Sequence, residues 1–175
     1  MIDASEFPMR FSMTKEEALQ VWKKHSFWHV LYDYPLDSEN NQGIKKIDAE
    51  TFITLMQEKF PNFIPYWESH IGSFGLAVGV TLQVFPLCDY TIDVMKSNDE
   101  SETKRIFDFV EFLLDEGDDK LQTALTTSYL EYLMNKDPDE IQFRKFSKYL
   151  GKNSIDYCRA WDEFMGCKTE GLWDV

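Results

Sequence analysis

The sequence predicts an all-α protein, an irregular bundle of about seven helices arranged largely as helical hairpins. Three observations support this prediction. Apolar residues recur at the spacing of one helical face through most of the chain, and capping residues or prolines stand where these patterns begin and end. The segment with the strongest β character, residues 72–88, is short and has no evident partner strand.

The first predicted helix begins at Thr14, because Thr14 and Glu17 form a capping box. Its apolar residues, which include two tryptophans, extend to Leu31. Residues 33–46 are polar and contain both a proline and a glycine. We therefore expect an exposed loop over these residues.

The second predicted helix begins after its cap, Asp48, and ends close to Pro61. Residues 72–88 then leave two interpretations open, because they combine β-branched residues with glycines that weaken a helix. We favour a broken helix followed by a buried helix that is kinked at Pro86, since a lone strand would have no partner. A short β-hairpin is the alternative.

The second half of the chain has the clearest helical patterns, and two amphipathic runs meet there at Gly117. We expect Gly117 to be a left-handed C-cap, and Asp118 and Asp119 to open the next helix. The predicted helices run from Asn98 to Glu116, from there to Lys136, from Pro138 to Gly151, and through Trp161, with residues 167–175 as a tail. No repeat of 34 or 40 residues is visible, so any solenoid character would be irregular.

The length and composition limit what the protein can be. A chain of 175 residues suits one domain, which we assign to residues 1–175. The net charge of −13 argues against direct binding of nucleic acid, because phosphate contacts need clustered cations. The chain lacks a run of ~20 apolar residues and begins without a signal-peptide pattern, so we expect no membrane contact and a cytoplasmic location. Three cysteines without a metal-binding or redox spacing are expected to be unreactive core residues: Cys88, Cys158 and Cys167.

Histidines offer the one spacing that is typical of a metal site. His25 and His29 stand four residues apart on the first predicted helix, so both imidazoles could reach one metal ion. Ser26 occupies the position where a metalloprotease carries its glutamate, which weakens this interpretation. A small metal-dependent enzyme with His70 as a third ligand is therefore the least favoured alternative. The sequence predicts no catalytic residue, no metal and no cofactor.

The carboxylates divide into two groups. Most stand at predicted helix starts, where the helix dipole favours them. Asp108, Glu111 and Asp115 instead share one face of a helix, and only Asp108 has a cation, Lys104, at a matching position. Trp161 also stands beside acidic residues and could anchor a partner, although a docked tail is the favoured explanation. The candidate partner-binding residues are Asp108, Glu111, Asp115, Glu116, Glu131 and Trp161.

Two segments, GDDKLQTALTTSYLEYL and KYLGKNSIDYCRAWDEFMG, resemble an uncharacterised family of all-helical bacterial proteins. The shared pattern is a Gly-Asp turn, a helix rich in small residues that ends Leu-Glu-x-Leu, a Leu-Gly-x-x-Ser element and an aromatic final helix. The resemblance extends roughly from Phe52 to Gly166. Members of this family are often encoded beside polymorphic or contact-dependent toxins, so the resemblance implies an immunity protein.

The charge pattern and the resemblance together favour a binding protein over an enzyme. The expected function is immunity, in which an acidic helical surface binds and neutralises a cognate toxin with a basic surface. A nuclease is the favoured toxin, because nucleases are basic around their substrate groove and complementary charge speeds association. A helical adaptor for another endogenous partner would use the same surface and is the alternative.

Overall fold

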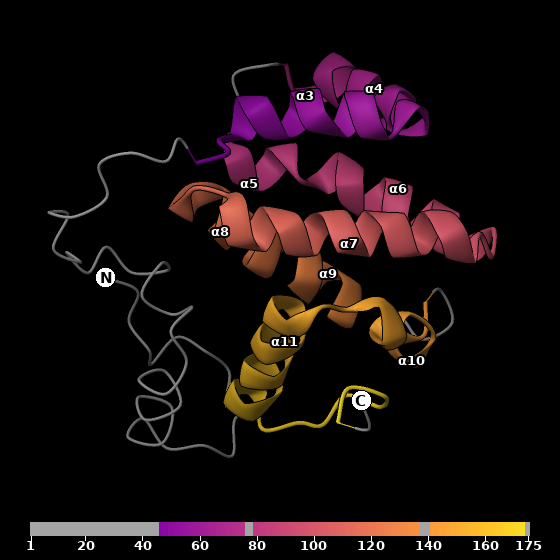
Figure 1. Cartoon of the computed structure of the whole chain (residues 1–175), viewed down its shortest axis with the longest axis vertical. Helices are drawn as coiled ribbons and strands as arrows, with labels where there is room; N and C mark the ends of the chain where they lie inside the picture. The colour runs from indigo at the N-terminus through magenta and orange to yellow at the C-terminus, as the bar shows by residue number, and fades with distance from the viewer. Residues whose placement is uncertain (1–45, 76–78, 137–140, 174–175) are drawn as a thin grey trace, which may run out of the picture.

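A computed structural model describes residues 46–75, 79–136 and 141–173 of the chain (Figure 1). These residues form an all-α structure, as the sequence predicts. The predicted first helix and residues 33–45 of the predicted loop lie outside the described residues, and Lys46 at the end of that loop is exposed. Within the described residues, no helix is both long enough and apolar enough to cross a membrane.

The elements follow one another along the chain with short connections. In order they are α3 (Ala49–Lys59), η2 (Pro61–Phe63), α4 (Ile64–Phe74), α5 (Val80–Gln83), α6 (Phe85–Lys96), α7 (Glu100–Glu116), α8 (Asp119–Ala124), η3 (Leu125–Leu130), α9 (Glu131–Met134), α10 (Phe143–Phe146), η4 (Ser147–Tyr149) and α11 (Lys152–Met165). The segments α8, η3 and α9 form one continuous helix whose middle part, η3, has π-helical geometry.

Three helices begin where the sequence places an aspartate cap. The side chain of Asp48 accepts a hydrogen bond from the backbone of α3, Asp99 does so for α7, and Asp118 does so for α8. Each aspartate satisfies a backbone N–H that has no partner within its own helix. The predicted cap of α3 at Asp48 and the opening of α8 at Asp118 are therefore confirmed, and α7 begins at Glu100, close to the start at Asn98 that the sequence predicts.

The described part of residues 72–88 contains the end of α4, all of α5 and the start of α6 and no strand, so the β-hairpin alternative is wrong there. The chain leaves α4 at Gly75, which has a positive φ of 76°, and resumes in α5. The predicted kink at Pro86 is wrong. It lies in the first turn of α6, where a backbone N–H would have no intrahelical partner and the fixed φ of proline suits the helix.

Gly117 is not a left-handed C-cap, because its backbone is extended, with φ −69° and ψ 153°. It pairs with Ile47 in an isolated parallel β-bridge, in which Asp118 N donates to Ile47 O at 2.8 Å. A Cβ atom at this position would lie 2.5 Å from the Leu113 carbonyl oxygen. Glycine is needed here for a close approach of backbone atoms, not for a positive φ.

The predicted helix from Pro138 to Gly151 is much shorter in the structure. Residues 137–140 lie outside the described part of the chain, and beyond them only α10 and the single 3-10 turn η4 form. Phe143 and Phe146 are buried, and their rings meet edge to face at 4.7 Å between centroids. Packing of these two rings, more than helix length, holds this segment in place.

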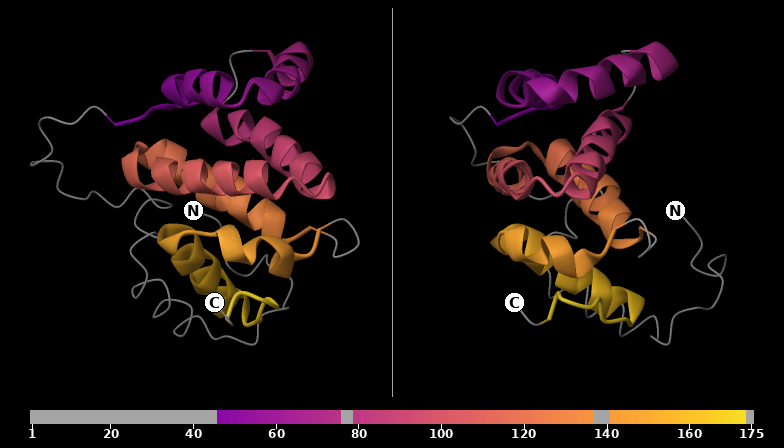
Figure 2. Two further views of the ribbon diagram at one scale, coloured as in Figure 1. Left: turned by 45° about the vertical axis from the view of Figure 1, so that its right-hand side comes forward. Right: turned by 90° about the vertical axis from the view of Figure 1, so that its right-hand side faces the viewer.

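The helices are stacked in tiers, with α3 and α4 at one end and α10 and α11 at the other (Figures 1 and 2). Helix α6 contacts both α4 and α7, and α7 contacts α11. The core is rich in aromatic residues, and Phe107 stacks on Phe146 with 5.4 Å between ring centroids. Helix α7 therefore connects the middle of the bundle to its last tier.

Two of the three cysteines are core residues, as predicted. Cys88 and Cys158 are fully buried, and burial raises the pKa of both thiols. Cys88 Sγ also donates to the carbonyl oxygen of Ser128 in the π-helical segment, at 3.5 Å. Cys167 does not fit the prediction, since it is exposed in the tail. Partial burial of its thiol and the hydrogen bond to Asp162 raise its pKa to about 11.

Candidate functional site

Glu111, a predicted partner-binding residue, forms its hydrogen bonds within the molecule. Its carboxylate lies at the N-terminus of α11 and accepts hydrogen bonds from the backbone N–H groups of Asn153 and Ser154 and from the Ser154 hydroxyl, the last at 2.8 Å. A Cβ atom on Gly151 would lie 2.3 Å from the Glu111 side chain, so a glycine is needed beside it. Glu111 has no cation partner on its own helix, as the spacing predicts, but the backbone amides at the start of α11 bind its carboxylate and favour it there.

Glu131 is also held inside the fold. It lies at the start of α9, half-buried, and accepts a hydrogen bond from the Tyr157 hydroxyl on α11. Burial raises the pKa of Glu131 to about 7, and the bond from Tyr157 lowers it in part. Glu131 thus links α9 to α11 and does not extend an exposed acidic surface.

Trp161 is half-buried against the core, and its ring lies 5.8 Å from that of Phe164. The tryptophan of the tail, Trp173, is 38% exposed, and its Nε1 donates to Asp162 at 2.8 Å. Asp162 is fully buried and also accepts from Thr169. The favoured sequence interpretation, a docked tail, is confirmed through Asp162, which the sequence analysis did not single out.

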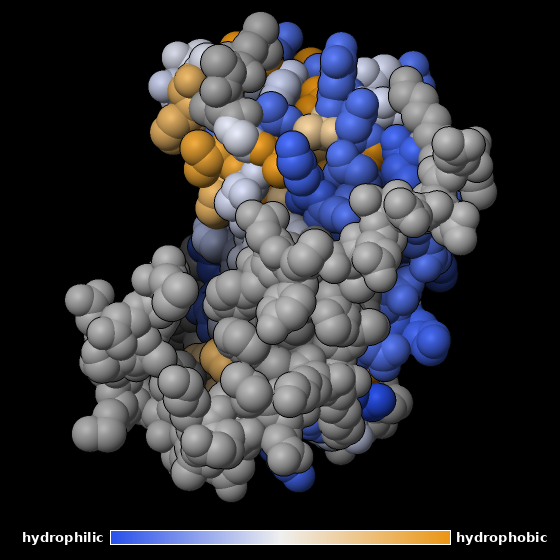
Figure 3. All heavy atoms as spheres, turned by 90° about the vertical axis from the view of Figure 1, so that its left-hand side faces the viewer, coloured by the Kyte–Doolittle hydropathy of each residue, from blue (hydrophilic) through white to orange (hydrophobic). Residues whose placement is uncertain are grey.

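The remaining predicted acids stay on the surface of α7 and surround an exposed aromatic ring. Phe112 is 42% exposed, and its helical neighbours three and four residues away are Asp108, Asp115 and Glu116, all exposed. We call these four residues the α7 patch. Figure 3 shows extensive hydrophilic surface beside apolar surface on one face of the molecule.

The carboxylates of the α7 patch differ in their surroundings. Lys104 pairs with Asp108 at 2.5 Å, so a cation lies beside this carboxylate. Asp115 accepts a hydrogen bond from Asn153 at 2.7 Å, and this neutral partner supplies no positive charge. Glu116 lies at the C-terminal end of α7, where the helix dipole disfavours an anion. The negative charge is therefore concentrated at Asp115 and Glu116, beside Phe112.

The exposure of Phe112 was not predicted, because aromatic residues were expected to lie in the core. A signal was available, since Phe112 lies off the stripe formed by Ile106, Phe109 and Leu113. All three stripe residues are buried. Phe112 instead packs one side of its ring on Phe109, with 5.9 Å between ring centroids, and presents its other side to solvent.

A second group of carboxylates lies in a cavity of about 450 Å³ lined by residues of η2, α4, α6 and α7. Each of these carboxylates has a structural partner. Tyr66 donates to Asp93 at 2.8 Å, Tyr90 donates to Glu102 at 2.6 Å, and Asp99 caps α7. Burial, followed by the bond to Asp93, raises the pKa of Tyr66 to about 12, so its hydroxyl stays protonated.

Of the three histidines considered for a metal site, the structure describes only His70. His25 and His29 lie outside the described residues. His70 is 8% exposed and stacks on Trp67 with 5.8 Å between ring centroids, and its Nε2 has no hydrogen-bond partner among the described residues. No group of three or more His, Cys, Asp or Glu side chains in the described ranges could hold a metal ion.

Comparison with known proteins gives one match. A family model described as a domain of unknown function (DUF7674) matches residues 53–166, which is 114 of the 175 residues and includes the whole α7 patch. That description contains no link to toxins or immunity. No curated protein and no solved structure matches the chain.

Proposed function

We propose that this chain, which belongs to the DUF7674 family of unknown function, is a binding protein that neutralises a cognate toxin domain through the α7 patch. The observation that carries the proposal is Phe112, exposed beside Asp115 and Glu116 on the longest described helix. Aromatic side chains that fill a partner's pocket supply much of the binding energy at protein interfaces. The surrounding carboxylates then determine which partners are accepted.

The chemistry of the patch favours a basic partner. Two uncompensated carboxylates beside an apolar ring complement a surface in which Lys or Arg side chains surround an apolar depression. The net charge of −13 adds long-range attraction for such a surface, which raises the association rate at low salt. A nuclease domain is the favoured toxin, because its substrate groove must be basic, and binding at that groove would exclude the nucleic acid.

The choice of a toxin, within the larger class of basic partners, rests on the sequence resemblance between residues 52 and 166. The same patch would serve an adaptor that binds another endogenous protein. The two functions differ in one observable property, because an immunity protein must restore growth to cells that contain the active toxin.

The test is growth of cells that express the C-terminal fragment of the adjacent upstream reading frame, with and without this protein. We expect rescue by the native chain and loss of rescue with the double variant Phe112→Ala and Glu116→Lys. Both positions are exposed, and a lysine at the end of α7 suits the helix dipole, so the double variant should keep its fold.

A matched control is the double variant Phe74→Ala and Glu68→Lys on α4. It removes one exposed aromatic ring, 62% exposed, and reverses one exposed carboxylate away from α7. We expect this control to rescue growth fully. Rescue by all three proteins would exclude the α7 patch as the binding surface, and a toxic fragment that the native chain does not neutralise would favour the adaptor.

A further inference from the structure

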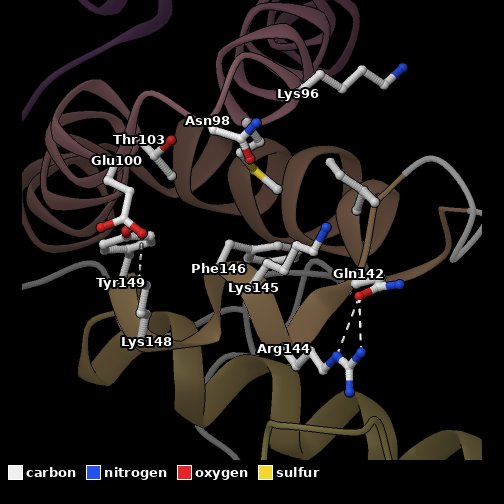
Figure 4. Close-up of a pocket in the computed structure, with 12 residues that line it drawn as sticks. Lys96, Asn98, Glu100, Thr103, Gln142, Arg144, Lys145, Phe146, Lys148 and Tyr149 are labelled. Carbon is white, nitrogen blue, oxygen red and sulfur yellow. Dashed lines mark hydrogen bonds and ion pairs between the residues drawn. The ribbon is translucent and has the colours of Figure 1, made fainter.

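A groove of about 670 Å³ lies between the turn that joins α6 to α7 and the segment α10–η4 (Figure 4). Among the described residues, its lining contains four cationic side chains, Lys96, Arg144, Lys145 and Lys148, and one carboxylate, Glu100. This composition is opposite to that of the whole chain, which carries 31 Asp and Glu against 18 Lys and Arg. We call this feature the basic groove.

Two cations of the basic groove form ion pairs that are exposed to solvent. Lys148 pairs with Glu100 at 3.1 Å, and Arg144 with Glu170 at 3.3 Å, but all four side chains are more than half exposed. Ion pairs with this exposure contribute little to stability and exchange readily with other anions. Lys145, exposed on α10, is drawn beside Phe146 in the groove (Figure 4). Among the described residues that line the groove, cations therefore outnumber carboxylates.

Apolar side chains complete the lining beneath these cations. Phe146 and Ile141 are buried, while Met95 and Tyr149 are half-buried. A cationic rim above an apolar floor suits a ligand that has both anionic groups and an apolar side chain. Arg144 adds a planar guanidinium, which binds carboxylates in a bidentate manner.

We propose that the basic groove binds a short acidic peptide segment of a partner protein, with one large apolar side chain on the floor and its carboxylates on the rim. A cavity of about 670 Å³ can take only a few residues. A longer polyanion such as nucleic acid would extend beyond the groove, where the acidic surface of a chain with a net charge of −13 would repel its phosphates. This inference is independent of the toxin proposal, because the two surfaces bear opposite charges.

The test uses the full-length protein and a fluorescein-labelled decapeptide of alternating Glu and Leu, with fluorescence anisotropy as the readout. We expect saturable binding that weakens as salt is raised. The double variant Arg144→Ala and Lys145→Ala should bind at least about tenfold more weakly, since each lost charged contact is worth about a factor of ten. The control double variant Lys120→Ala and Lys152→Ala removes two exposed lysines outside the groove and should bind as the native chain does.

A second measurement locates the peptide without any variant. In a nitrogen-15 NMR titration of the native protein, the peptide should shift the amide signals of Phe146 and Tyr149 more than those of α3. No binding at millimolar peptide, or equal binding by the two double variants, would overturn the proposal. Equal affinity for an alternating Glu and Gln peptide would show that the apolar floor does not contribute to binding. Tighter binding of an oligothymidylate at the same residues would overturn the peptide proposal and indicate that the ligand is a nucleic acid.

Discussion

At the scale of single residues, Glu131 shows how strongly the fold changes ionisation. Its half-buried carboxyl group accepts a hydrogen bond from Tyr157, and burial raises its pKa from the ordinary 4.5 to about 7. The native state therefore holds a proton on Glu131 at pH values where the unfolded chain has lost it. Ionisation of this group consequently opposes folding.

This pKa shift predicts a pH-dependent stability. Below about pH 4.5 both states are protonated and Glu131 contributes no penalty; from there to about pH 7 the unfolded state loses its proton first, so the free energy of unfolding falls. The variant Glu131→Gln should lack this decrease and gain stability relative to the native chain as the pH rises. Urea unfolding of both proteins across this range measures the difference, and a constant difference would contradict the assigned pKa.

Tyr157→Phe provides a second readout at the same place. The hydrogen bond from Tyr157 favours the ionised form of Glu131, so its removal should raise the pKa of Glu131 further. Carbon-13 NMR of the Glu131 carboxyl group in the native and variant proteins would follow this titration directly.

At the scale of elements, α7 and α11 are joined by the Glu111 carboxylate. The residues that donate to it, Asn153 and Ser154, lie 42 and 43 positions later in the chain, so the contact forms only when the two helices pack. Helix α11 has no side-chain cap of its own, since its N-cap is Gly151. Glu111 acts as that cap from another helix.

Glu111→Ala should therefore destabilise the protein by about 2–3 kcal/mol, because several hydrogen bonds to an ionised group are lost at a helix end. Asp108→Ala on the same helix removes a carboxylate that pairs with the exposed Lys104, and it should cost at most about 1 kcal/mol. Urea unfolding of the two variants gives the comparison. Equal costs would mean that the Glu111 cap contributes little.

At the scale of the whole molecule, the charged residues are distributed unevenly along the chain. The last described stretch, residues 141–173, has six Lys and Arg against four Asp and Glu, although the chain as a whole is acidic. The α7 patch and the basic groove thus lie on parts of the molecule with opposite charge balance. The tail packs on α11 in this part of the chain, because the buried Asp162 of α11 accepts hydrogen bonds from Thr169 and Trp173.

We expect Asp162→Ala to release the tail and to cost about 3 kcal/mol, because the donors of Thr169 and Trp173 would lose a buried acceptor that binds both. Limited proteolysis followed by mass spectrometry should detect new cleavage between residues 167 and 173. Asp156→Ala, an exposed position on the same helix, is the control and should leave cleavage unchanged. Equal cleavage of the two variants would show that Asp162 does not retain the tail.

The helices that could be predicted are those whose signals lie within one or two turns. The caps Asp48, Asp99 and Asp118 and the apolar stripe of α7 act on nearby backbone, so their effects are readable from the sequence. The extended backbone of Gly117 was not predictable in this way. It depends on Ile47, which lies 70 positions earlier and pairs with Gly117 only in the folded chain.

The sequence alone therefore determined the all-α class, the aspartate-capped helix starts and the acidic character of the chain, because propensity, capping and charge are local or additive properties. The tertiary structure decided which carboxylates remain available. It placed Glu111 and Glu131 in contacts with α11 and left Asp115 and Glu116 beside an exposed Phe112. It also gathered cations from distant segments into one groove. These outcomes depend on how helices pack, since a charge acquires its partner only when residues far apart in the sequence meet.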